Sequence, residues 1–252
     1  MELSAIHVPL DTWTAEDVQA AVKAAPPALC GEAAEANTLA SIKPCDTFAE
    51  LLYQLYPTHT GNLAAAGRLA ERVAKSSDVT TKAGTLSLDQ SVYPPKGHIG
   101  VVGNLTVQGD LDVVAALVVT GNLTVEGTLR DCGPQSRVVV LGDLECDHVW
   151  SSGWITVVGD VRIRGVLFGT YNDDAFEAHG SISAGAIVAD EHAFEAKGGL
   201  APRNQPADAG VWGPGIYDLR DRGHAEALKQ LLGSGTIDDQ DELVWERIPR
   251  AF

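Results

Sequence analysis

Apolar residues recur in the middle of the chain with a period that is neither helical nor that of a simple hairpin. Polar residues such as Thr106 and Asp112 alternate with them, as in strands that bury one face. Small residues, mostly glycine, separate the strands and allow the backbone to turn. Each stretch of six residues therefore predicts one short strand and one corner. Five leucines lie six residues apart and four valines repeat that spacing: Leu105, Leu111, Leu117, Leu123, Leu129, and Val107, Val113, Val119, Val125.

A longer repeat contains this short one. It reads Gly, a variable residue, an aliphatic residue, another variable residue and a small apolar residue, and its spacings are 19, 18, 21, 17 and 21 residues. Such spacings are typical of a solenoid. The sequence predicts a mainly β protein with a parallel, three-sided β-solenoid of about six coils over residues 84–199. A sandwich of hairpins would not need the sixfold leucine spacing. The repeats open at Gly84, Gly103, Gly121, Gly142, Gly159 and Gly180.

The two flanks of the repeat follow other patterns. Residues 1–83 contain amphipathic stretches with helix-start signals, such as Thr14 to Asp17, and predict an α-helical N-terminal region. Residues 200–252 contain a Pro- and Gly-bearing segment, a short helix from His224 to Leu232 and an apolar ending. They predict a small C-terminal cap. We expect both regions to cover the open ends of the solenoid, which would otherwise pair with other chains.

The form of the repeat, Gly-[Asn/Asp]-Leu-x-Val as in Gly103 to Val107, resembles the bactofilins, which are polymer-forming cytoskeletal proteins with a β-helix. The resemblance covers residues 84–199 only. It implies a solenoid and, as an expectation about function, a scaffold that joins end to end. Two features depart from that family: the ordered-looking flanks and the unequal coil lengths.

The charge of the chain limits its partners. The net charge is −16, of which −9 falls on residues 84–199. Such a surface repels nucleic acid and anionic lipid and favours cationic partners. The chain has no apolar run of membrane-spanning length, and its start lacks the pattern of a signal peptide. We therefore expect a cytoplasmic protein that binds a basic protein partner, with no nucleic acid and no membrane.

The longer coils predict where a partner binds. Their extra residues fall at Arg130–Arg137 and Gly169–Ala175, and both insertions leave the rod at the same corner when counted from their opening glycines. Acidic and aromatic side chains gather along that edge, and aromatic anchors are common in protein interfaces. A plain solvated corner is the alternative interpretation. The predicted partner-binding residues are Arg130, Asp131, Gln135, Trp154, Tyr171, Asn172, Asp173, Asp174, Asp190, Glu191 and His192.

Signals for catalysis are weak. The histidines match no zinc-protease motif, and no G-x-S-x-G, P-loop or C-x-x-C is present. We expect no catalytic residue, no cofactor and no metal. The sequence favours a non-enzymatic binding module, in its simplest form a bacterial immunity or antitoxin protein that neutralises a cationic protein toxin. The bactofilin-like scaffold is the first alternative, and self-association, handedness and oligomeric state stay open.

A hexapeptide-repeat acyltransferase is the second alternative, because that class also has a sixfold repeat. Its repeat places Gly, Ala, Glu or Asp directly after the inward aliphatic residue. This chain has Thr106, Asp112, Val118 and Thr124 at those positions, and the sixfold phase stops after Leu129. The acyltransferase is therefore the less favoured of the two alternatives.

Overall fold

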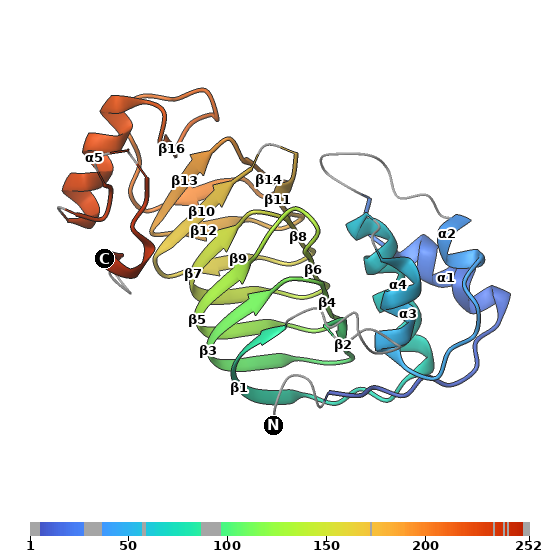
Figure 1. The fold of residues 1–252 in the computed structure, drawn as a ribbon. Coiled ribbons are helices and arrows are strands. Elements are labelled where there is room, and N and C mark those ends of the chain that lie inside the picture. Colours follow the sequence, from blue (N-terminus) through green and yellow to red (C-terminus); the bar gives the residue numbers. More distant parts are fainter. Residues whose placement is uncertain are drawn as a thin grey trace.

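The computed structural model describes residues 6–27, 37–56, 59–86, 97–171, 173–233, 235–238, 240 and 242–248. Its centre is a parallel β-solenoid of about five turns, which compares with the six coils expected from the sequence. The N-terminal helices lie along one side of the rod, and the C-terminal helix lies beside another part of it (Figure 1). The predicted fold class, a mainly β parallel solenoid with an α-helical N-terminal region, is confirmed.

Three stacks of strands form the three sides of the rod. The first side contains β2 (Ile99–Val101), β4 (Ala116–Val119), β6 (Arg137–Val140), β8 (Trp154–Val157), β11 (Ala175–Ala178) and β14 (Ala193–Ala196). The second side contains the first halves of β1 (Val79–Leu86), β3 (Leu105–Val113), β5 (Leu123–Asp131) and β7 (Leu144–Ser151), and continues in β9 (Val161–Ile163), β12 (Ile182–Ala184) and β15 (Leu200–Pro202). The third side contains the second halves of the same long strands and continues in β10 (Val166–Thr170), β13 (Ala186–Asp190) and β16 (Ile216–Asp218).

The sixfold leucines and valines form the inner core of the rod. Parallel pairing stacks Leu105 on Leu123, and Leu123 on Leu144, so that equivalent residues lie above one another in successive turns. These side chains are fully buried. Because each turn bonds only to its neighbours, the rod is held together by such ladders along its whole length.

The strands of the solenoid extend along the chain beyond the predicted residues 84–199 at both ends, although the turns are fewer than expected. β1 begins at Val79, and its register pairs Gly84 with Leu111, so Gly84 does not occupy the same corner as Gly103. At the other end β15 and β16 complete the last turn beyond Gly199. The irregular spacing at both ends of the repeat conceals these strands, because only the central hexads keep a strict phase.

The N-terminal helices pack against a side of the rod, whereas the sequence analysis expects them on its open end. They are α1 (Ala15–Ala24), α2 (Asn37–Ala40), α3 (Phe48–Leu55) and α4 (Thr60–Val73). α1 begins with the predicted capping box of Thr14 and Asp17. α3 and α4 cover the outer face of the first side, where Val118 and Val139 join the helical core (Figure 1). Outward-facing apolar residues on these strands provide the surface that the amphipathic helices need.

The C-terminal region likewise packs on a side, the third. α5 (Arg222–Leu232) and the 3-10 helix η2 (Trp245–Arg247) bury Leu228 and Trp245 against Phe168 and Val188, which point outward from β10 and β13. Single residues reach the ends instead. Ile6 belongs to the solenoid core, and the blue segment that begins at residue 6 runs past β1 at that end of the rod (Figure 1). Trp212 packs on the core together with Ala196 and Leu200 of the last turn.

Candidate partner-binding edge

Both predicted insertions leave the rod at one corner, between the third side and the first. The long loops join β5 to β6 and β10 to β11, and shorter loops join β7 to β8 and β13 to β14. The strands that lead into the corner are in register, since Asp131 pairs with Ser151 and Thr170 with Asp190. Stacked turns therefore bring the four loops together along one edge. We call this the loop edge.

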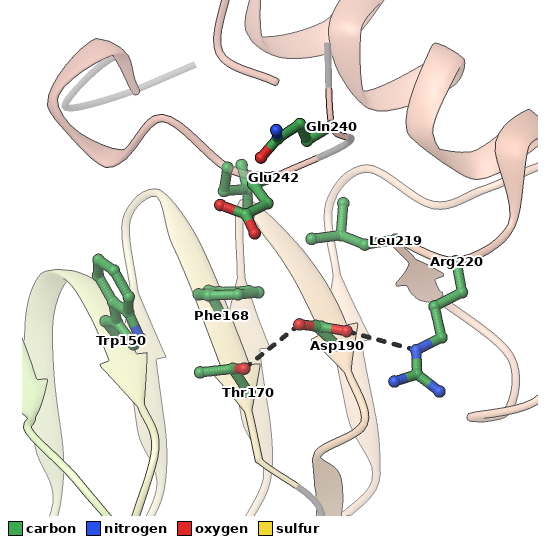
Figure 2. Close-up of a pocket in the computed structure, with 9 residues that line it drawn as sticks. Trp150, Phe168, Thr170, Asp190, Leu219, Arg220, Gln240 and Glu242 are labelled. Carbon is green, nitrogen blue, oxygen red and sulfur yellow. Dashed lines mark hydrogen bonds and ion pairs between the residues drawn. The ribbon is translucent and has the colours of Figure 1, made fainter. Parts of the chain in front are cut away.

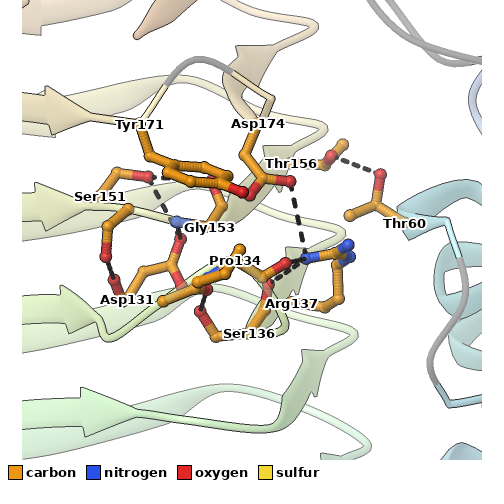
Figure 3. A network of polar contacts seen from close by, with 12 residues as sticks. Thr60, Asp131, Pro134, Ser136, Arg137, Ser151, Gly153, Thr156, Tyr171 and Asp174 are labelled. Atoms are coloured by element: carbon orange, nitrogen blue, oxygen red, sulfur yellow. Dashed lines mark hydrogen bonds and ion pairs between the residues drawn. The ribbon is translucent and has the colours of Figure 1, made fainter. Parts of the chain in front are cut away.

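A buried carboxyl group holds the first two loops. The side chain of Asp131 is fully buried, and its Oδ2 accepts hydrogen bonds from the backbone N–H of Gly153 at 2.9 Å and from the Ser151 hydroxyl at 3.2 Å (Figure 3). Burial raises the pKa of Asp131 well above its usual range, since desolvation penalises the charged form. A side chain at Gly153 would collide with this carboxyl and with the Gly133 carbonyl. Asp131 therefore holds the corner together and is not a contact for a partner.

Arg137 fixes the third loop. Its guanidinium donates to the carbonyl oxygens of Pro134 and Ser136, each at 2.7 Å, and lies 3.8 Å from the carboxylate of Asp174 (Figure 3). Asp174 is buried, and that burial raises its pKa although the nearby guanidinium lowers it. The pair joins the β5–β6 loop to the β10–β11 loop.

The fourth loop is held by a histidine and an arginine. The ring of His192 is fully buried and its Nδ1 lies 2.9 Å from the Tyr171 carbonyl, while burial lowers the pKa of the imidazole. Arg220, which follows β16, forms ion pairs with Asp190 at 3.5 Å and with Glu191. The C-terminal region is thereby attached to the loop edge.

Two residues of this edge have left-handed backbone conformations. Tyr171 has a φ of 86° and Glu191 a φ of 58°, and they are the non-glycine residues with positive φ in the described part of the chain. Tyr171 is also one of the exposed large apolar side chains, with 40% of its surface accessible. Strained backbone of this kind concentrates at functional sites.

The structure divides the predicted binding residues into three groups. Gln135, Tyr171 and Asp173 are exposed, whereas Arg130, Trp154, Asp190 and Glu191 are partly exposed. Asp131, Asp174 and His192 are buried, which removes them from any contact surface. The predicted residue Asn172 lies outside the described residues.

Arg130 lies on the outer face of the third side rather than in a loop, and it pairs with Asp112 at 3.0 Å. In the neighbouring turn its register partner is Trp150. The outer face of this side therefore continues from Arg130 to the aromatic residues of the next turns, a continuity that the sequence analysis does not identify.

A recess beside the loop edge was not predicted. It has a volume of about 520 Å³ and lies between the outer face of β7, β10 and β13 and the C-terminal segment (Figure 2). Its lining comes from positions 150 to 243, so only the folded chain assembles it. The positions of Trp150, Phe168 and Thr170, which alternate along their strands with residues of the inner core such as Val149 and Leu167, were the available signal. The lining residues are Trp150, Phe168, Thr170, Asp190, Leu219, Arg220, Gln240, Glu242 and Leu243.

The fold and this edge define the chain as a parallel β-solenoid with loops gathered on one corner. Comparison with protein-family models, with curated proteins and with solved structures finds no match. The predicted β-helix repeat is thus confirmed, while the likeness to the bactofilin family stays a prediction. In the described part of the chain, three or more His, Cys, Asp or Glu side chains do not gather in a metal-binding arrangement. Helices with the length and apolar character to cross a bilayer are likewise absent from that part.

Proposed function

We propose that this chain is a non-enzymatic, cytoplasmic binding protein that docks a cationic protein along the loop edge. Its simplest biological form is a bacterial immunity or antitoxin protein that neutralises a basic toxin. The observation that carries the proposal is the left-handed backbone of Tyr171 and Glu191, both on this edge. Conformations of this kind persist where the surrounding structure enforces them, and they occur at binding and active sites.

Charge and side-chain chemistry support the same partner. The exposed Tyr171 lies beside the exposed carboxylate of Asp173, and Asp190 and Glu191 follow in the next turn. Tyrosine supplies contact area with a polar end, which is why it is enriched at the energetic centre of interfaces. Carboxylates around such an anchor steer a basic protein toward it, within a chain of net charge −16.

A polymerising scaffold needs ends that stack on another copy. Ile6 at the β1 end and Trp212 at the last turn both pack on the solenoid core. Residues in these positions favour a discrete binder, because they cover apolar surface that a stacked copy would otherwise bury. Sedimenting filaments of the purified chain would favour the scaffold instead.

The test uses the product of the gene adjacent to this one, measured for binding by calorimetry and for growth arrest in cells. We expect a complex, rescue of growth on co-expression, and affinity that falls as salt rises. The double variant Asp173→Lys and Glu191→Lys should weaken binding about tenfold or more, since both side chains reach the surface. The matched control reverses Glu126 and Glu195, two exposed carboxylates outside the loop edge. Equal weakening by both variants, or none by the first, would refute docking at this edge.

A further inference from the structure

The recess beside the loop edge has an aromatic floor. Trp150 and Phe168 point outward from β7 and β10 and line the recess (Figure 2), with their ring centroids 5.7 Å apart, and the ring centroid of Trp245 lies 5.3 Å from that of Trp150. The volume of about 520 Å³ lies within the range of sites that hold a ligand or a large side chain. Because β-strands of the rod and the packed Trp245 hold these rings, the floor is formed before any ligand arrives.

Acidic groups surround that floor. The carboxylate of Asp190 accepts a hydrogen bond from the Thr170 hydroxyl at 3.3 Å and pairs with Arg220 on the other side. Glu242 is exposed, and Figure 2 shows its carboxylate pointing toward Phe168 from the opposite wall. The recess therefore brings carboxylates and aromatic rings together, which is a combination that binds organic cations.

Arg220 indicates which cation fits. Its guanidinium is bound by Asp190 and Glu191 at the outer rim, so this wall already accommodates that group. Glu242 on the opposite wall has no such partner among the described residues. A guanidinium can stack on an indole and bind a carboxylate at the same time, whereas an ammonium is a compact and strongly hydrated charge.

We propose that this recess receives an arginine side chain of the protein partner, with the guanidinium between Trp150 and Glu242. This inference rests on the proposed function, because it names the anchor that a cationic partner inserts beside the loop edge. Arginine and tryptophan are both enriched among the residues that dominate interface energetics, and such residues tend to pair with one another across an interface. The carboxylates of the loop edge would attract any basic protein, whereas the recess would select a partner that presents an arginine at this position.

The test titrates the full chain with N-acetyl-arginine amide and, in parallel, with N-acetyl-citrulline amide, which has nearly the same shape without the charge. The indole signals of the tryptophans report occupancy by NMR. We expect saturable shifts with the arginine compound and binding at least about fivefold weaker with the citrulline compound. Equal binding of the two compounds, or no saturable shift with either, would overturn the inference.

Variants locate the binding. Glu242→Gln should weaken binding of the arginine compound about three- to fivefold, as expected for an ion pair formed by an exposed carboxylate. Trp150→Ala should weaken it about tenfold, and Trp150→Phe, which keeps an aromatic face and guards against a folding defect, should weaken it less. Glu126→Gln is the matched control and should leave it unchanged. Unchanged binding in both Glu242→Gln and Trp150→Ala would also overturn the inference.

The two proposals fail separately. If the adjacent gene product binds and the Asp173 and Glu191 variant weakens it while Glu242→Gln does not, the loop edge stands and the recess is not the anchor. If the arginine compound binds in the recess but the gene product does not bind the chain, the recess stands and the proposed function falls.

Discussion

The backbone N–H of Asn122 donates a hydrogen bond of 2.7 Å to the side-chain Oδ1 of Asn104, one turn earlier in the solenoid. The same bond recurs along the corner between the first and second sides. The side-chain Oδ1 of Asn122 accepts a hydrogen bond from the backbone N–H of Asp143 at 2.9 Å. The side-chain Oδ1 of Asp143 in turn accepts one from the backbone N–H of Asp160 at 2.9 Å. The Asn or Asp that follows Gly103, Gly121, Gly142 and Gly159 thus satisfies a backbone donor where the strands turn and ladder bonds are interrupted.

The first prediction concerns this ladder. Asn122→Ala removes the acceptor for the Asp143 N–H and should lower the free energy of unfolding by about 1 kcal/mol, because the position is exposed and water replaces part of the bond. Asn122→Asp keeps an acceptor oxygen, as the chain itself does at Asp143 and Asp160, and serves as the control. Urea denaturation measures both. Equal loss in the two variants would show that the amide donor, rather than the acceptor, matters.

The second prediction concerns the contact between α3 and the first side. A Cβ at Gly100 would lie 2.1 Å from Cδ1 of Phe48, which is fully buried. Gly100→Ala should therefore displace α3 and destabilise the protein by about 1–3 kcal/mol through overpacking. Limited proteolysis should cut within residues 37–56 sooner than in the unchanged protein.

A double variant separates overpacking from a general effect at Gly100. Phe48→Leu removes the ring that meets the new methyl group, so its cost and that of Gly100→Ala should combine to less than their sum. If the two losses in unfolding free energy are additive, the new methyl group at position 100 does not clash with the Phe48 ring.

The rod could be predicted because its chemistry is local and periodic. Leu105 and Leu123 occupy equivalent positions in successive turns, so the repeat distance in the sequence directly gives the number of residues in one turn. The attachment of the flanks could not be predicted in the same way. Val118 and Val139 point outward to meet α4, and a strand that is apolar on both faces does not reveal what covers its outer face.

The candidate site was predictable in position but not in composition. Insertions at equal offsets leave a solenoid at the same corner, which placed Gln135 and Tyr171 together. Burial within the corner depends on how loops close on one another, and the sequence gives no measure of it for Asp131 or His192. The recess brings together Trp150 and Glu242, which lie far apart in the sequence, and no spacing rule relates their positions.

The third prediction uses the buried carboxyl of Asp131. Its Oδ1 has no hydrogen-bond partner among the described residues, and it faces the side of Gly153 where the Gly133 carbonyl lies. A raised pKa means that the folded state keeps its proton at pH values where the unfolded chain has lost it. Stability therefore falls as pH rises above the ordinary carboxyl range of about 4.

Asp131→Asn should remove that part of the pH dependence, because an amide donates at the same position without a charge. At pH 8 it should be as stable as the unchanged protein or more so, whereas Asp131→Ala should lose about 1–3 kcal/mol by leaving the Gly153 N–H without its acceptor. Denaturation at pH 5 and pH 8 tests this. A marked loss of stability in Asp131→Asn at pH 8 would mean that the native carboxyl is charged.

The last prediction concerns His98, which lies against Tyr56 with ring centroids 4.6 Å apart and against Tyr53 at 5.8 Å. Desolvation lowers the pKa of His98 to about 4. The folded state then keeps the imidazole neutral while the unfolded chain binds a proton below its ordinary pKa of about 6.5. The contribution of His98 to the free energy of unfolding is therefore fully present above pH 6.5. It is lost as the pH falls toward 4, by up to about 2–3 kcal/mol. His98→Phe, which keeps an aromatic ring between the tyrosines, should flatten the stability profile between pH 6.5 and 4, and an unchanged slope in this variant would assign the acid sensitivity to other groups.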